Sequence, residues 1–91
     1  MQVIDNPGDA RYEGWVDDAL AGFAEYRSAG EGVVLIPHTE VNPRLRGRGV
    51  ASAIVQFALD DLRQKGFRVI PACPYVRVWI ERHPGYADLV P

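Results

Sequence analysis

The chain has 91 residues, of which 47% are hydrophobic, and its formal net charge at pH 7 is −2. This length predicts a single domain over residues 1–91, near the small end of what folds around one core, and the composition excludes intrinsic disorder. The acidic balance argues against a nucleic-acid-binding protein, which usually carries a clear basic excess.

The single cysteine, Cys73, excludes an internal disulfide and fits a reducing compartment. No apolar run approaches the roughly 20 residues needed to cross a bilayer. The first residues also lack the charged and then apolar pattern of a leader. These features predict a cytoplasmic protein with no membrane partner.

The first third of the chain alternates short apolar runs with turn-forming residues. Residues 3–4 form a candidate strand that ends at the turn-forming run 5–9. Two further strands are predicted over residues 11–16 and 20–27, with a turn at residues 17–18. Three extended runs separated by short gaps predict an antiparallel meander.

A fourth strand is predicted over residues 33–41, because the β-branched residues at its start favour extended structure. Pro37 interrupts this strand. Because proline has no amide hydrogen to donate, it marks either a bulge or the place where pairing on one side stops. A glycine-containing turn follows and leads into the clearest helical pattern of the chain.

This helix begins after Gly49 and is expected to stop at Gly66. Its polar residues at positions 60, 61 and 63–65 are expected to face solvent. Apolar residues recur at helical spacing and form one stripe. The stripe consists of Val50, Ala51, Ile54, Val55, Ala58, Leu59 and Leu62.

Residues 67–70 predict a short strand parallel to the fourth, because a helix connects the two. Pro74 occupies a favoured first-turn position of a second helix, which ends at residues 84–85. The order β-β-β-β-α-β-α predicts an α+β fold with a mixed sheet, in which the meander precedes a βαβ unit and a C-terminal helix. The apolar stripe of the second helix is Tyr75, Val76, Trp79 and Ile80.

The turn before the first helix carries the most specific chemistry. Gly47 and Gly49 allow a tight bend and close approach of the backbone to a ligand. The amides that follow belong to a helix start, where unpaired N–H groups and the positive end of the dipole attract phosphate. The pattern predicts a pyrophosphate cradle for a nucleotide-bearing cofactor. Arginines add charge there, with a solvated loop as the alternative: Arg44, Arg46 and Arg48.

These motifs resemble those of the GCN5-related N-acetyltransferases. The acetyl-CoA motif of that family reads Gln/Arg-x-x-Gly-x-Gly/Ala, which Arg44, Gly47 and Gly49 match in a strand–turn–helix setting. The chain is similar above all to the minimal single-domain subfamily, because four ordered segments match its pattern. These segments are His-Thr-Glu-Val at 38–41, Arg-Gly-Arg-Gly at 46–49, Pro-Ala-Cys-Pro at 71–74 and Arg-His-Pro at 82–84.

The resemblance implies a CoA-binding fold in which two strands splay apart and the pantetheine arm lies in the gap. It implies acetyl transfer from acetyl-CoA to a primary amine of a small molecule or a protein. A strand amide near Val41 should polarise the thioester carbonyl. A non-catalytic module that binds CoA or acyl-CoA is the alternative, and no pattern specifies an oligomeric state. The pyrophosphate would contact backbone amides of Arg46, Gly47, Arg48, Gly49, Val50 and Ala51.

Three residues are candidates for the chemistry. Cys73 precedes a helix whose positive end points toward its sulfur, which lowers a thiol pKa, although a lone cysteine is usually a small buried hydrophobe. The resemblance implies a role for it as an acetyl acceptor. His38 and Glu40 lie two apart on a strand and should share one face. Either is expected to accept a proton from an incoming ammonium or from Cys73, unless they form only a solvated strand end.

The remaining polar and aromatic residues favour structural roles. Arg82 and His83 lie near the C-terminus of the last helix, where positive charge complements the dipole. Trp15, Trp79 and the tyrosines are expected in the core or at its rim. No spacing of His, Cys or acidic residues is typical of a metal site.

Overall fold

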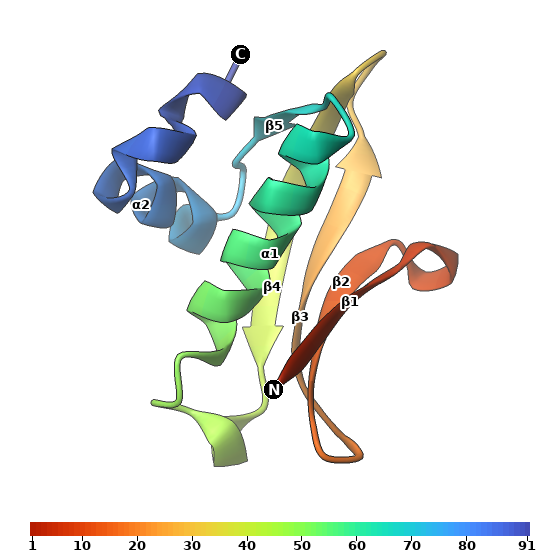
Figure 1. Cartoon of the computed structure of the whole chain (residues 1–91), viewed down its shortest axis with the longest axis vertical. Coiled ribbons are helices and arrows are strands. Elements are labelled where there is room, and N and C mark those ends of the chain that lie inside the picture. The colour runs from red at the N-terminus through yellow and green to blue at the C-terminus, as the bar shows by residue number, and fades with distance from the viewer.

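The computed structural model describes all 91 residues, and Figure 1 shows one sheet flanked by two helices. The strand order is β1-β2-β3-β4-β5, antiparallel through β4 and parallel between β4 and β5. The predicted α+β fold, with its meander and βαβ unit, is confirmed. The elements are β1 (Gln2–Asn6), β2 (Arg11–Val16), β3 (Ala19–Ser28), β4 (Val33–Val41), α1 (Val50–Gln64), β5 (Arg68–Ile70) and α2 (Pro74–Arg82).

Three 3-10 helices were not expected from the sequence pattern. They are η1 (Pro7–Asp9), η2 (Pro43–Leu45) and η3 (Pro84–Leu89). The last one returns the chain to the core, where Leu89 is buried. No helix of the structure is long and apolar enough to span a membrane.

The core lies between α1 and the sheet, with α2 beside α1 next to β5 (Figure 1). The predicted stripe of α1 is buried there, except that Ala51 is half-buried. It packs with residues on the inner face of the sheet, among them Tyr12, Ala24 and Ile36. Truncation of Ile54 or Leu59 to alanine would cost about 2–5 kcal/mol of stability, as expected for a fully buried aliphatic side chain.

Two helix positions differ from the sequence-based expectation. Asp61, expected to face solvent, accepts a hydrogen bond from the Tyr12 hydroxyl at 2.7 Å, because the tyrosine crosses the core and its hydroxyl needs a partner at the far edge. Tyr75, expected in the apolar stripe of α2, is 41% exposed. Its side chain lines a groove near Ser52 of α1 instead of entering the core.

Pro37 marks a bulge between β3 and β4. Glu25 pairs with His38, whereas Arg27 pairs with Leu35, so two residues of β4 stand opposite one of β3. A bulge of this kind shifts the alternation of the side chains that follow it. The bulge therefore decides which residues at the end of β4 face the helices.

Pro37 also follows the point at which β4 and β5 separate. Their parallel pairing ends where Leu35 stands opposite Ile70. One more backbone hydrogen bond joins the two segments, from the Cys73 amide to the Ile36 carbonyl at 2.9 Å. Both alternatives that the sequence offered for Pro37 are thus realised, and the end of β4 has one edge free of strand pairing.

Candidate active site

The free edge of β4 presents two backbone amides to the gap beyond β5. On the other edge, the Asn42 amide donates to the Ala21 carbonyl of β3 at 2.7 Å. Because successive amides of a strand point to opposite sides, the amides of Thr39 and Val41 point away from β3 and into the gap. The Val41 amide therefore has the direction required of the predicted donor to a thioester carbonyl.

Cys73 lies on the other side of this gap, at the N-cap of α2. Its sulfur is 3.5 Å from the Thr39 hydroxyl, and the residue is only 5% exposed. Burial opposes ionisation of the thiol, but the Thr39 hydroxyl and the backbone amides of Val76, Tyr75 and Thr39 outweigh it, so the pKa of Cys73 lies below its usual value. The thiol is buried like a core residue and polarised like a nucleophile.

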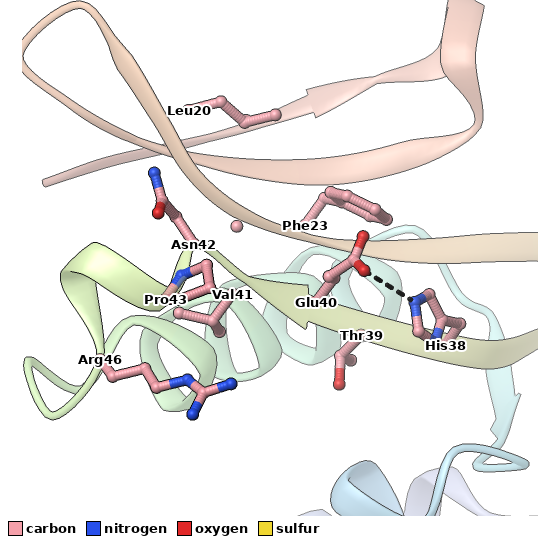
Figure 2. Close-up of a pocket in the computed structure, with 10 residues that line it drawn as sticks. Leu20, Phe23, His38, Thr39, Glu40, Val41, Asn42, Pro43 and Arg46 are labelled. Atoms are coloured by element: carbon pink, nitrogen blue, oxygen red, sulfur yellow. Dashed lines mark ion pairs between the residues drawn. The ribbon is translucent and has the colours of Figure 1, made fainter.

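His38 and Glu40 share the opposite face of β4, as their spacing predicted. Their side chains are 51% and 60% exposed, and His38 Nε2 lies 4.0 Å from Glu40 Oε1. Figure 2 shows Glu40 and Thr39 on opposite sides of the strand. The expectation that either residue takes a proton directly from Cys73 is therefore not supported, because the strand separates them from the thiol. Proton uptake from an incoming ammonium remains compatible with their exposure.

A pocket of about 530 Å³ opens on the His38 and Glu40 face. Phe23 stands opposite Glu40 in the β3–β4 register and forms one wall (Figure 2). Gly22 allows the two strands to approach closely beneath the pocket, since a Cβ there would lie 2.5 Å from the Glu40 carbonyl oxygen. The lining residues are Leu20, Gly22, Phe23, His38, Thr39, Glu40, Val41, Asn42, Pro43 and Arg46.

The glycine turn forms a second pocket, of about 240 Å³. Gly47 and Gly49 have φ angles of +77° and +72°, a left-handed backbone that favours glycine. Gly49 is the N-cap of α1 and offers no side chain to cap its first amides. A Cβ at either glycine would meet no protein atom within 4 Å and would project into open space. The turn thus fits an anionic ligand such as the diphosphate of CoA.

The arginines of the turn differ in their position. Arg46 lines both pockets, together with Val41, so the two spaces meet at the end of β4. Arg44 and Arg48 are exposed and line neither pocket. The structure therefore brings Arg46 to the site and leaves the other two arginines at its periphery.

The cradle pocket also contains residues proposed from the sequence and residues that the sequence analysis missed. Ser52 and Tyr75 were not singled out as binding residues, and Thr39 was noted only within a motif. Ser52 lies in the first turn of α1, three residues after Gly49, so only its role was overlooked. Tyr75 reaches the cradle, and Thr39 reaches the gap beside it, through packing of segments distant in the chain, which no local pattern reveals. The lining residues are Val41, Leu45, Arg46, Gly47, Gly49, Val50, Ala51, Ser52 and Tyr75.

Comparison with known families agrees with this geometry. Residues 11–89 match the family model described as GCN5-related N-acetyl-transferase, and the chain belongs to this family. It is 32% identical to protein NATD1 of Bos taurus over 59 residues, and 30% identical to the Homo sapiens protein of the same name. The Bos taurus alignment covers 65% of this chain and 52% of the relative, so the matched region spans about half the length of those proteins.

Solved structures share the fold. The solution structure of a GCN5-like putative N-acetyltransferase from Staphylococcus aureus superposes with a TM-score of 0.76 at 19% identity, covering 99% of this chain and 87% of that one. A ribosomal-protein-alanine N-acetyltransferase from Brucella melitensis gives a TM-score of 0.62 at 22% identity, covering 79% and 58%. The protein is thus an acetyltransferase-family domain with the corresponding mixed sheet.

Proposed function

We propose that this protein is an acetyl-CoA-dependent N-acetyltransferase that moves an acetyl group to a primary amine. Family membership supports acyl transfer in general. The observation that supports transfer from acetyl-CoA to an amine is the unpaired edge of β4. This edge lies between the glycine cradle and an open pocket with two proton acceptors. The single thiol, Cys73, is compatible with a reducing, cytoplasmic location.

Each part of the site has a distinct task in this reaction. Acetyl-CoA supplies an acetyl group activated as a thioester. The amides of the cradle and Arg46 hold the diphosphate. The Val41 amide donates to the carbonyl oxygen where negative charge develops, which is the interaction that contributes most to such transfers. Glu40 or His38 accepts a proton from the acceptor ammonium and so frees the nitrogen lone pair for attack.

Direct transfer to an amine in the pocket beside Glu40 agrees best with these positions. The exposed carboxylate and imidazole stand where an ammonium from solvent arrives, whether it belongs to a small molecule or to a protein. A route through acetylated Cys73 is the second candidate, because its polarised thiol borders the same gap. The 5% exposure of Cys73 and its separation from both proton acceptors count against this route.

The first test is acetyl-CoA binding followed by transfer. CoA should raise the melting temperature, because a ligand that binds only the folded state adds RT ln(1 + [L]/Kd) to stability. Release of free CoA thiol in the presence of a panel of primary amines should then report transfer. Binding without transfer to any amine would favour the alternative, a non-catalytic CoA-binding module.

Mass spectrometry separates the two routes. After mixing with acetyl-CoA alone, the covalent route predicts one added acetyl group on Cys73 that disappears when amine is supplied. The direct route predicts an unmodified protein under the same conditions together with full transfer once amine is present.

A further inference from the structure

Asn42 follows the last residue of β4, and all of its hydrogen-bonding groups but one are used within the protein. Its backbone amide donates to the Ala21 carbonyl at 2.7 Å, and its carbonyl accepts from the Leu45 amide at 2.9 Å. Its side-chain Oδ1 accepts a hydrogen bond from the Arg44 amide at 3.0 Å, which caps η2. These bonds fix both the backbone and the side chain of Asn42.

The group that is left is the side-chain nitrogen, Nδ2. Because a backbone amide only donates, the side-chain atom that faces the Arg44 amide must be the oxygen, and this sets the orientation of the Asn42 side chain. Nδ2 therefore points away from η2, on the side of the pocket that holds Leu20 (Figure 2). It takes part in none of the side-chain hydrogen bonds of the molecule, so its hydrogens are available to a ligand.

We propose that Asn42 selects the acceptor by donating from Nδ2 to a carbonyl oxygen, and that the acceptor is an α-amino amide. In this group a single carbon separates the amine from the carbonyl. It is found at the amino end of a polypeptide and in small amino-acid amides. The inference rests on the proposed function, because it names the class of amine that the pocket beside Glu40 accepts.

The spacing of Glu40 and Asn42 fits such a group. The two residues are two positions apart on extended backbone, so their side chains leave the same side about 6.6 Å apart. Figure 2 shows both on the side opposite Thr39. Glu40 would accept from the ammonium and Asn42 would donate to the carbonyl, each over about 2.9 Å. Since the nitrogen and the carbonyl oxygen of an α-amino amide lie about 3 Å apart, these lengths together bridge the two side chains.

The same spacing disfavours other primary amines. In a lysine side chain, the whole aliphatic chain separates the amine from the nearest carbonyl, which then lies beyond the reach of Asn42 when the amine is at Glu40. A simple alkylamine has no carbonyl at all. Either ligand leaves Nδ2 without its partner, so it lacks one hydrogen bond that an α-amino amide makes.

The other walls of the pocket offer the carbonyl no competing donor near Asn42. Leu20 and Phe23 of β3 are half-buried apolar residues that line the pocket. Arg46 extends on the opposite side of β4, where it also lines the cradle (Figure 2). At this end of the pocket, a carbonyl of the acceptor therefore finds its donor in Asn42.

Steady-state transfer from acetyl-CoA to matched amines tests this inference. Glycinamide carries the α-amino amide, propylamine has a similar size without the carbonyl, and Nα-acetyl-lysine amide presents a side-chain amine. Asn42→Asp and Asn42→Ser each keep an oxygen that can cap η2 but lose the NH₂ group. In both variants, the ratio of kcat/KM for glycinamide to kcat/KM for propylamine should fall about three- to tenfold, the usual contribution of one hydrogen bond. The corresponding ratio for the lysine derivative and propylamine should stay constant.

Gln2→Glu is the matched control for changing an amide into a carboxylate, because Gln2 is exposed and lines none of the pockets. It should keep the wild-type ratios. The intrinsic reactivity of each amine is the same for every variant and cancels in the comparison. A tripeptide with a free amino end distinguishes the two sources of the group. A higher kcat/KM than that for glycinamide would assign the acceptor to polypeptides, and an equal or lower value would assign it to small amides.

The outcomes separate this inference from the proposed function. Wild-type ratios in Asn42→Asp and Asn42→Ser would overturn the selection by Asn42. An equal loss for all amines would also overturn it, because Asn42 would then act only by holding η2 in place. Both results would leave transfer to amines intact. CoA binding by the wild-type protein without transfer to any amine would overturn the proposed function together with this inference.

Discussion

The Thr39 hydroxyl lies 3.5 Å from the Cys73 sulfur, across the gap that opens where β4 and β5 separate. On the other face of the same strand, His38 and Glu40 stand beside the open pocket. Three consecutive residues therefore present a thiol-polarising hydroxyl to one side and proton acceptors to the other. The two candidate routes of acetyl transfer approach the same gap from opposite faces.

The contact with Thr39 makes the reactivity of Cys73 predictable. Thr39→Val keeps the shape of the side chain but removes the hydroxyl that favours the thiolate, so burial should raise the pKa of Cys73. The pH profile of alkylation by a small thiol reagent should move to higher pH. Thr39→Ser is the control and should retain the wild-type profile. An unchanged profile in Thr39→Val would mean that the backbone amides alone polarise the sulfur.

The proton acceptors can be tested by replacing each with a glutamine, which is polar and does not accept a proton near neutral pH. At least one of Glu40→Gln and His38→Gln should lower kcat/KM by about 10²–10⁴-fold, the usual contribution of a positioned general base. CoA affinity should stay constant, because neither residue lines the cradle. Glu25→Gln is the matched control, because it removes a carboxylate opposite His38 on β3 that does not line the pocket. It should keep wild-type turnover. Wild-type turnover in both variants would exclude proton acceptance by this pair.

Cys73→Ala distinguishes a reacting thiol from a structural one. The substitution should leave CoA affinity nearly intact, because Cys73 lines neither the cradle nor the open pocket. Steady-state transfer measures the outcome. Loss of transfer in a folded variant would support the covalent route, and wild-type turnover would remove the thiol from the mechanism and leave direct transfer.

The parts of the site that sequence analysis predicted are those with local causes. Gly47 and Gly49 adopt the left-handed backbone that glycine permits, and the amides of α1 follow directly in the chain. Pro37 lies at the bulge in the β3–β4 pairing, as expected for a residue with no amide hydrogen to donate. The stripe of α1 follows from helical periodicity. Such features depend on a few neighbouring residues and can therefore be predicted from the sequence.

The parts that it could not predict depend on segments meeting in space. The contact between Thr39 and Cys73 joins residues 34 positions apart, and the one between Tyr12 and Asp61 joins residues 49 positions apart. The bulge at Pro37 shifts the alternation of β4, so the face on which Thr39 lies could not be derived from spacing alone. The separation of Cys73 from His38 follows from that shift.

Alanine substitution should have different effects on CoA binding at two glycines that share a positive φ, because only one of them lines the cradle. Gly49→Ala and Gly66→Ala each place a side chain at positive φ, +72° and +83°, and each should lower the free energy of unfolding by about 1 kcal/mol. Only Gly49→Ala should weaken CoA, since Gly49 lines the cradle pocket and Gly66 lines none of the pockets. Thermal unfolding and calorimetric titration measure the two effects. Equal CoA affinity of both variants would contradict diphosphate binding at this turn.

Next to Phe23 in the β2–β3 register, Glu13 forms a buried ionic cluster on β2. The residue is 3% exposed, and its carboxylate accepts hydrogen bonds from Arg11 at 2.6 Å and from Trp15 Nε1 at 3.1 Å. The Arg11 guanidinium also lies 4.5 Å from the centroid of the Phe23 ring, which forms a wall of the pocket. Arg11 thus contacts both the buried carboxylate of Glu13 and a side chain that lines the pocket.

Arg11→Met should make this stability dependent on pH in a defined direction. Burial opposes ionisation of Glu13, but the hydrogen bonds from Arg11, Asn6 and Trp15 outweigh it and hold its pKa below the usual value. A carboxyl whose pKa is lowered by folding stabilises the protein above its unfolded pKa, and that stability is lost as the pH falls through the folded pKa. The variant should therefore lose about 1–3 kcal/mol at neutral pH, because a buried carboxylate is left without its charged partner. The loss should shrink in acid, where Glu13 is protonated in both proteins.

Urea unfolding of the wild-type protein and of Arg11→Met at several pH values measures this change. Arg27→Met, at an exposed arginine, is the control. A difference in stability that does not depend on pH would mean that Arg11 acts only through its packing on Phe23.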